Sequence, residues 1–267
     1  MTAPPAPGTL VLVPNTLDLG EDAPTDIRDV LPDGVLREAA RLMHWVAEDA
    51  RSARAFLKRV HAVHPLGRPL QEIDIRELPR PLKGARPAPA RTGAHSVPSD
   101  PWPALLGPAQ AGQDLGLLSE AGLPAVADPG AALVSAAHAL HIPVRVLPGP
   151  SALLLALAAS GLNGQSFAFV GYLPQDATAR VARIRELEAL SRKQGQAQLF
   201  IETPYRNEAL LAALLATLAP TTRLSVSAGL TLPAVFTRCD TAARWRALPG
   251  TLPEKTPAVF VIEGGRA

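Results

Sequence analysis

Three turns built from small residues carry the first chemical signal in this sequence. They are Ser119–Pro124 (Ser-Glu-Ala-Gly-Leu-Pro), Asp128–Gly130 (Asp-Pro-Gly) and Pro148–Ser151 (Pro-Gly-Pro-Ser). Two of them follow short apolar runs, and the third precedes an Ala-rich helical segment. Small residues let a ligand approach the backbone closely, and in parallel sheets ligands bind beyond the carboxyl ends of the strands. We therefore expect a ligand site at these turns.

Other site chemistries fit the sequence poorly. The run 149–153 (Gly-Pro-Ser-Ala-Leu) lies between a predicted strand and helix, as a G-x-S-x-G nucleophile turn does, but Leu153 replaces the last small residue. His138 and His141 lie three apart on one predicted helix, yet no third metal ligand is suggested. Neither a P-loop nor a G-x-G-x-x-G motif is present. A serine hydrolase, a metal site and a classical nucleotide site are therefore disfavoured.

The elements that position these turns alternate between strands and helices. In the first half, apolar runs predict strands at 9–13, 44–47, 116–118 and 144–147, and helices at 27–31, 35–42 and 52–60, the last capped by Ser52. In the second half we predict helices at 151–162, 180–191 and 207–218, the last capped by Asn207, and strands at 167–171, 198–201, 223–226, 235–238 and 258–263.

This order predicts an α/β protein of two domains. The first, 8–150, should contain a mainly parallel sheet because its strands alternate with helices. The second, 151–267, should contain a mixed sheet because long helices are missing between its late strands. Residues 1–7 are expected to be a disordered tail rich in proline and alanine.

Composition indicates a soluble cytoplasmic protein. Of 267 residues, 47% are apolar, which is enough for a proper core. The single cysteine, Cys239, excludes an internal disulfide framework and fits a reducing compartment. The amino terminus lacks the basic region of a signal peptide, and the longest apolar helix, 151–162, is too short to span a bilayer.

Charge is distributed unevenly along the chain. Residues 51–91 hold ten Lys or Arg and three acids, a local charge of +7 against +2 for the whole chain. This asymmetry fits a polyanionic partner such as RNA, or equally a solvated basic loop. The stretch overlaps a Pro-rich insert, 65–108, with ten prolines and no clear period. We expect the insert to be a long loop that acts either as a lid or as a tolerated insertion.

An ordered set of short blocks resembles the tetrapyrrole methylase superfamily, the class III S-adenosylmethionine-dependent methyltransferases. The blocks run Gly8-Thr9-Leu10, Ala47-Glu48-Asp49 with Arg51, the three turns above, Gly171–Pro174, Glu202–Arg206 and Val261–Gly264. Within the superfamily the chain is most similar to the enzymes that methylate a ribose 2′-hydroxyl in small-subunit ribosomal RNA. The resemblance covers nearly the whole chain except the Pro-rich insert.

The resemblance implies two α/β domains with the cofactor, S-adenosylmethionine, in the cleft between them, and a homodimer. Transferred by position, the cofactor-binding residues are Pro14, Ala121, Gly122, Leu123, Val126, Asp128, Ser151, Ala152, Ile201, Ala228 and Ala258. Many are small, which suits hydrogen bonds from the backbone to the cofactor. Tight turns and packing are the alternative explanation for these residue types.

The resemblance also implies a methyl acceptor. If the acceptor is a hydroxyl, a base must take its proton, and Glu48 and Asp49 are the best-placed carboxylates, with Glu202 as a second choice. A charge pair at a helix amino terminus explains Glu48 and Asp49 equally well. Arg51 and Arg206 could hold phosphate or carboxylate groups of the acceptor.

The chain departs from the ribosomal RNA methyltransferases in three places. Their His-Asn block after the second helix has no counterpart, because the Pro-rich insert lies there. Pro14–Asp18 replaces a Gly-rich first loop, and 228–232 (Ala-Gly-Leu-Thr-Leu) replaces a block with two basic residues and an acid. Two alternatives to an RNA acceptor therefore stay open. The enzyme could methylate a tetrapyrrole or another small molecule, or the chain could be a cofactor-binding module that has lost catalysis.

Overall fold

The chain folds into two compact units, Met1–Pro150 and Ser151–Ala267. The computed structural model describes residues 6–18, 25–79 and 101–265. The predicted disordered tail lies mostly outside these ranges, and so does the middle of the predicted lid, residues 80–100.

The first unit is built on a five-stranded sheet in the order β3-β2-β4-β1-β5. Its strands are β1 (Leu10–Val13), β2 (His44–Ala47), β3 (Asp74–Glu77), β4 (Leu115–Leu118) and β5 (Val144–Val146), and every neighbouring pair is parallel. The central strands β1 and β4 are buried throughout, which is why they appear in the sequence as continuous apolar runs. The parallel α/β fold expected for this half of the chain is confirmed.

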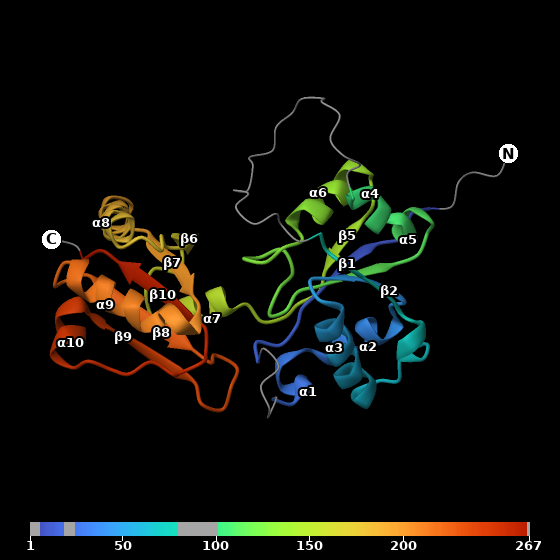
Figure 1. Cartoon of the computed structure of the whole chain (residues 1–267), viewed down its shortest axis with the longest axis horizontal. Coiled ribbons are helices and arrows are strands. Elements are labelled where there is room, and N and C mark those ends of the chain that lie inside the picture. The colour runs from blue at the N-terminus through green and yellow to red at the C-terminus, as the bar shows by residue number, and fades with distance from the viewer. Residues whose placement is uncertain (1–5, 19–24, 80–100, 266–267) are drawn as a thin grey trace. The chain divides into compact units, whose positions relative to one another are not determined.

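Helices cover both faces of this sheet, as Figure 1 shows. One core holds alternate strand residues such as Val11 and Trp45 with α1 (Ile27–Val30), α2 (Asp33–Arg41) and α3 (Ala50–Val63). The other holds Leu10 and Val46 with α4 (Trp102–Leu105), α5 (Gly107–Gln110) and α6 (Ala131–Ala139). The period of two along each strand therefore divides its side chains between two helical layers.

The Pro-rich insert is not a continuous irregular loop as predicted. A 3₁₀-helix, η1 (Leu70–Glu72), leads into β3, which pairs with β2 as the edge strand of the sheet, and α4 and α5 form at the far end of the insert. The strand escaped prediction because three of its four residues, Asp74, Arg76 and Glu77, are charged and none of the four is fully buried. An edge strand with one neighbour does not need a continuous apolar run.

The predicted cap of α3 was wrong. The helix begins two residues earlier than Ser52, and its N-cap is Asp49, whose carboxylate accepts from the backbone N–H groups of Arg51 and Ser52. A carboxylate is a strong N-cap because it also stabilises the positive end of the helix dipole.

The second unit contains a mixed five-stranded sheet in the order β6-β7-β10-β8-β9, as expected. Its strands are β6 (Phe167–Tyr172), β7 (Ala197–Glu202), β8 (Arg223–Ala228), β9 (Phe236–Thr241) and β10 (Ala258–Glu263); only the pair β6–β7 is parallel. One face packs against α7 (Ala152–Ser160). The other packs against α8 (Ala177–Gln194), α9 (Asn207–Thr217) and α10 (Ala242–Ala247). In the described part of the chain, no helix has the length and apolar character needed to cross a membrane.

Asn207 does not cap α9, contrary to the prediction. It is the first residue of the helix, and its side chain donates instead to the carbonyl of Thr256 at 2.8 Å. The short helix α10 was not predicted, although Thr241 accepts from the N–H of Arg244 as an N-cap.

Close packing of β2 on β4 depends on Gly116. A Cβ added there would lie 2.6 Å from the Trp45 ring, which is buried in the first core. We expect Gly116→Ala to lower the free energy of unfolding by about 1–3 kcal/mol, because the ring must move off its site. Gly107→Ala is the control, since a Cβ there meets nothing within 4 Å. Urea unfolding of both variants measures the difference, and equal stability would contradict the packing argument.

Candidate functional site

The turns singled out by the sequence meet at one edge of the first sheet. Pro14 follows β1, Glu48 follows β2, Ser119 follows β4 and Pro148 lies just beyond β5. Because all these strands are parallel, their carboxyl ends lie at the same edge. This carboxyl edge is therefore the candidate site of the first unit.

Asn15 joins two of these loops. Its side-chain amide donates to the carbonyls of Ser119 (3.1 Å) and Glu120 (3.0 Å), and its backbone N–H donates to the carbonyl of Gly122 (2.9 Å). Asn15 is 7% exposed. A buried carbonyl left without a donor would cost free energy, so this one side chain fixes the loop after β1 against the loop after β4.

Two glycines of the site lie where a larger residue would be strained or would clash with a neighbouring loop. Gly122 has a left-handed backbone (φ 69°), and an added Cβ would lie 3.3 Å from the carbonyl oxygen of Pro150. At Gly149 an added Cβ would fall 2.3 Å from the Cβ of Pro14. Gly122 and Pro14, two of the predicted cofactor-binding residues, thus also hold the loops together by close contact.

The loop from Ala121 to Asp128 has a strained backbone and several N–H groups without a protein acceptor among the described residues. Ala125 and Ala127 both adopt left-handed conformations (φ 65° and 64°), which are strained for any residue with a Cβ and cluster at functional sites. Within the described residues, the N–H groups of Ala121, Leu123, Ala125 and Ala127 donate to no other protein group. The side chain of Val126 is 43% exposed. The loop thus offers unused donors beside an exposed apolar side chain.

Three carboxylates surround this loop. The backbone N–H of Glu120 donates to Oε1 of Glu48 at 3.4 Å. Burial, and then the negative charges of Asp128 and Glu120, raise the pKa of Glu48 to about 7. Burial, with a further contribution from Glu120, raises the pKa of Asp128 to about 6. The raised pKa values mean that Glu48 and Asp128 exchange protons near neutral pH. Among residues 6–18, 25–79 and 101–265, no group of three or more Asp, Glu, His or Cys could hold a metal ion.

The structure separates Glu48 from its neighbour Asp49. Asp49 is the N-cap of α3, and Glu77 adds a second carboxylate there by accepting from the N–H of Ala50 at 3.1 Å. The alternative role, a negative charge at the amino terminus of a helix, therefore applies to Asp49. Glu48 instead faces the loop after β4. Arg51, in the first turn of α3, is exposed.

In the second unit, predicted site residues share a row of the sheet. Ala258 pairs with Glu202 on one side and with Ala228 on the other, and Ile201 pairs with the next residue, Val259. All four lie where β7 and β8 end and β10 begins. The small side chains of Ala228 and Ala258 are buried.

The remaining predicted residues lie next to this row or on α7. Arg206 donates from Nε (2.9 Å) and Nη2 (2.6 Å) to Oε1 of the buried Glu202, so its charge is already paired within the unit. Ser151 is the N-cap residue of α7 by position, but its side chain forms no capping hydrogen bond. Ala152 and Ile201 pack against the core between α7 and the sheet.

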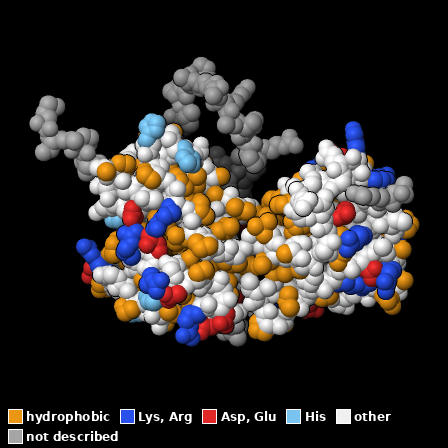
Figure 2. Space-filling view, turned by 180° about the vertical axis from the view of Figure 1, so that it is seen from behind, with side chains coloured by type: hydrophobic (Ala, Val, Ile, Leu, Met, Phe, Trp, Pro, Cys, Tyr) orange, Lys and Arg blue, Asp and Glu red, His pale blue; other side chains and the backbone are white. Residues whose placement is uncertain are grey.

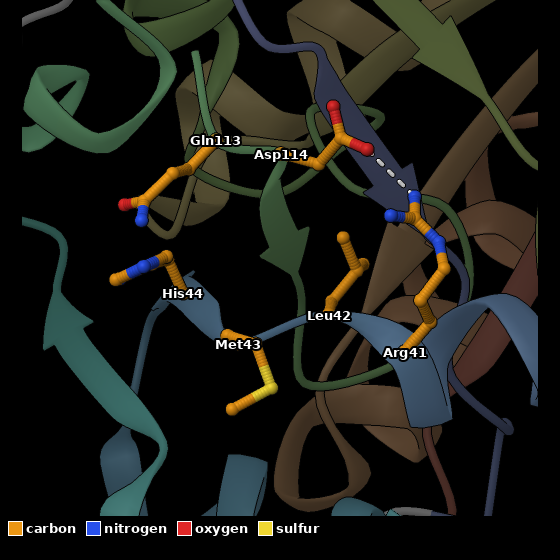
Figure 3. A pocket seen from close by; sticks show the side chains of 6 residues that line it. All are labelled: Arg41, Leu42, Met43, His44, Gln113 and Asp114. Carbon is orange, nitrogen blue, oxygen red and sulfur yellow. Dashed lines mark hydrogen bonds and ion pairs between the residues drawn. The ribbon is translucent and has the colours of Figure 1, made fainter. Parts of the chain in front are cut away.

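A small pocket lies at the opposite, amino edge of the first sheet. Figure 3 shows its lining: Arg41, Leu42, Met43, His44, Gln113 and Asp114. Its volume is about 100 Å³, and its one arginine is held by Asp114 at 2.7 Å and by Glu38 at 2.6 Å. Ligands of parallel sheets bind at the carboxyl edge, so this pocket is not the candidate site.

Several residues of the carboxyl edge were not predicted. Asn15 was identified only as part of a changed first loop, although an amide directly after a buried strand is a recognisable signal for loop bridging. Glu120 was noted inside its turn but given no role, although a carboxylate beside a glycine turn could have suggested one. The left-handed Ala125 and Ala127 have no sequence signal, since alanine is not typical of that conformation.

Comparisons with known proteins bear on the family and the fold of the chain. The profile of the family described as Tetrapyrrole (Corrin/Porphyrin) Methylases matches residues 102–241. Proteins named Ribosomal RNA small subunit methyltransferase I are similar in sequence. The one from Micromonospora olivasterospora is 43% identical over 114 residues (43% of this chain, 35% of the relative). The one from Mesorhizobium japonicum is 38% identical over 129 residues (48% and 42%). The matched regions thus span less than half of these relatives.

Solved structures share the fold of the whole chain. The methyltransferase CobJ aligns over 97% of this chain and 94% of its own, with a TM-score of 0.54 and 18% identity. A conserved hypothetical protein from Aeropyrum pernix K1 aligns over 98% and 86%, with a TM-score of 0.57 and 16% identity. At such low identity the likeness shows the fold alone.

The bridging role of Asn15 predicts a stability cost. Asn15→Ala leaves the carbonyls of Ser119 and Glu120 without their donor, so we expect the free energy of unfolding to fall by about 1–3 kcal/mol. Gln113→Ala removes an exposed amide from the same unit, and it should change the free energy of unfolding by less than about 0.5 kcal/mol. Denaturant unfolding compares the two, and an Asn15→Ala protein as stable as this control would rule out the bridge.

Proposed function

Because the chain belongs to the tetrapyrrole (corrin/porphyrin) methylase family, we propose that it is an S-adenosylmethionine-dependent methyltransferase. We further propose that its acceptor is a ribose 2′-hydroxyl of small-subunit ribosomal RNA. The relatives named Ribosomal RNA small subunit methyltransferase I support this acceptor at 38–43% identity over part of the chain.

One observation carries the proposal: the half-buried carboxylate of Glu48, whose pKa is raised to about 7, lies at the carboxyl edge of the first sheet. Methylation of a hydroxyl needs a group that takes its proton, and a base is most effective when its pKa lies near the working pH. An ordinary surface glutamate, with a pKa near 4.5, would be a weaker base.

The loop from Ala121 to Asp128 fits the methyl donor. Its unused N–H groups suit a ligand that carries a carboxylate and a heteroaromatic ring, and Val126 offers apolar surface beside them. When bound, S-adenosylmethionine supplies an electrophilic methyl group on its sulfonium.

In the proposed mechanism the chain positions the acceptor and removes its proton. Glu48, in its ionised form, would accept the proton of the 2′-hydroxyl and become neutral, as that oxygen gains the methyl group and the S–C bond of the donor breaks. Arg51, in the first turn of α3, holds an acceptor phosphate. The loop contacts of Asn15 keep Glu48 and its neighbours in place, which is the main contribution that a protein makes to group transfer between bound partners.

Incubation with tritiated S-adenosylmethionine tests this function. We expect label in small-subunit ribosomal RNA, recovered after nuclease digestion as a 2′-O-methylated nucleoside, and none in porphyrin precursors. Label in the porphyrin precursors alone would replace the RNA acceptor by a tetrapyrrole. Cofactor binding by calorimetry without label in either acceptor would favour a binding module, and no cofactor binding would overturn the proposal.

The role of Glu48 predicts a defined pH dependence. Its carboxylate is protonated below pH 7 and ionised above it, so the methyl transfer rate should rise about tenfold from pH 6 to pH 8. Glu48→Gln should lower the rate by about 10²- to 10⁴-fold and leave cofactor binding unchanged.

Asp49→Asn is the matched control, because asparagine keeps the cap of α3. This variant should retain most of the activity and the same pH profile. Equal losses in Glu48→Gln and Asp49→Asn would show that Glu48 is not the specific base. A homodimer and a cytoplasmic location stay predictions.

A further inference from the structure

The cations of the first unit fall into two groups. Six arginines of its described part form ion pairs with acids: Arg28, Arg37, Arg41, Arg59, Arg76 and Arg145. On the face drawn in Figure 2, Lys and Arg side chains likewise lie beside Asp and Glu side chains. The other four described cations, Arg51, Arg54, Lys58 and Arg68, form no such pair, and all lie within one stretch of 18 residues. Among the described residues of this unit, the cations without an ion pair are thus concentrated on α3 and the loop after it.

The sequence of α3 places its cations on one exposed face. Arg51, Arg54 and Lys58 follow a spacing of three and four, with His61 three residues further on, and all four are exposed. The helix contains no acid. Arg59 is not part of this face, because its side chain holds neighbouring loops in place. It forms an ion pair with the buried Asp18 at 3.0 Å and donates to the carbonyl of Thr25 at 2.8 Å.

This basic face ends in a pocket. The pocket is lined by Lys58 and His61 of α3 and by the loop from Leu66 to Gln71, with a volume of about 530 Å³. Arg68 provides a second cation, and Leu66 and Leu70 provide apolar surface. No carboxylate among the described residues lines it, and Glu72, which follows Gln71, lies outside.

His61 closes the loop of this pocket. Its Nδ1 accepts from the backbone N–H of Leu66 at 3.2 Å, which leaves Nε2 to carry the ring proton of the neutral form. The loop is also fixed by Gly67, whose N–H donates to the carbonyl of Ala40 at 3.1 Å. Lys58 and Arg68 are thus carried by ordered backbone rather than by a free tail.

We propose that Lys58 and Arg68 bind a backbone phosphate of the RNA substrate in this pocket, and that the α3 face guides the strand between the pocket and the carboxyl edge. The helix begins just after β2, at the edge that carries Glu48. The distance along its axis from Arg51 to His61 is about 15 Å. Cationic side chains that are not paired with acids are free to neutralise the phosphates of a polyanion. Binding is then favoured because the counterions of those phosphates are released. The inference rests on the proposed RNA acceptor, but concerns affinity rather than chemistry.

A double variant, Lys58→Gln with Arg68→Gln, tests the proposal against a matched control. The control, Arg185→Gln with Lys193→Gln, removes one arginine and one lysine that are exposed and unpaired on α8 in the described structure. Fluorescence anisotropy with a labelled transcript of small-subunit ribosomal RNA measures affinity between about 50 and 200 mM salt. Circular dichroism on heating verifies that both variants fold.

We expect the pocket variant to bind RNA about tenfold more weakly at low salt. The slope of log affinity against log salt should fall by roughly 0.7 to 0.9, because one phosphate is no longer neutralised. The control should match the wild type in both quantities, and cofactor binding should be unchanged in both variants. Equal affinity and slope in the pocket variant would overturn this inference alone. Loss of binding to phosphatidylserine vesicles with RNA affinity unchanged would assign the face to a lipid surface and overturn it. Absence of RNA binding by the wild type would overturn both the inference and the RNA acceptor, while cofactor binding would still support a methyltransferase.

Discussion

The hydrogen bonds of one amide side chain hold the candidate site of the first unit together. Asn15 donates to the carbonyls of Ser119 and Glu120 and thereby fixes the loop after β1 against the loop after β4. Parallel strands bring these loops to one edge of the sheet. The hydrogen bonds of the sheet itself do not fix the conformation of one loop relative to the other. The left-handed Gly122, whose carbonyl accepts from the N–H of Asn15, is a second part of the same arrangement.

The chemistry of the carboxyl edge depends on the fixed positions of these two loops. With the loop after β4 held in place, the N–H of Glu120 reaches Glu48, and burial and nearby negative charge keep that carboxylate less acidic than an ordinary glutamate. Asp49, one residue further, is stabilised by the amino end of α3 and serves as its cap. Two adjacent acids therefore have different roles because one ends a strand and the other begins a helix. The same helix carries its unpaired cations away from the edge.

The sequence predicted the fold well where burial leaves a clear pattern. The central strands β1, β4 and β10 are continuous apolar runs, and both sheets were expected with the right character, parallel in the first unit and mixed in the second. Prediction failed where tertiary contacts decide the structure. The polar edge strand β3 forms because β2 offers it a partner, and Asp49 rather than Ser52 caps α3 because the helix begins at the end of β2. At the site, the small residues of the turns were identified, but Asn15, Glu120 and the strained alanines act through the geometry of two loops that lie 104 residues apart in the chain.

The central claim is that the carboxyl edge of the first sheet keeps Glu48 available as a base near neutral pH. A carbon-13 NMR titration of the glutamate carboxyl groups tests it most directly, with the Glu48 signal assigned by its loss in Glu48→Gln. We predict a titration midpoint of about 7 for the Glu48 carboxyl group. A midpoint near the ordinary glutamate value of 4.5 would contradict it.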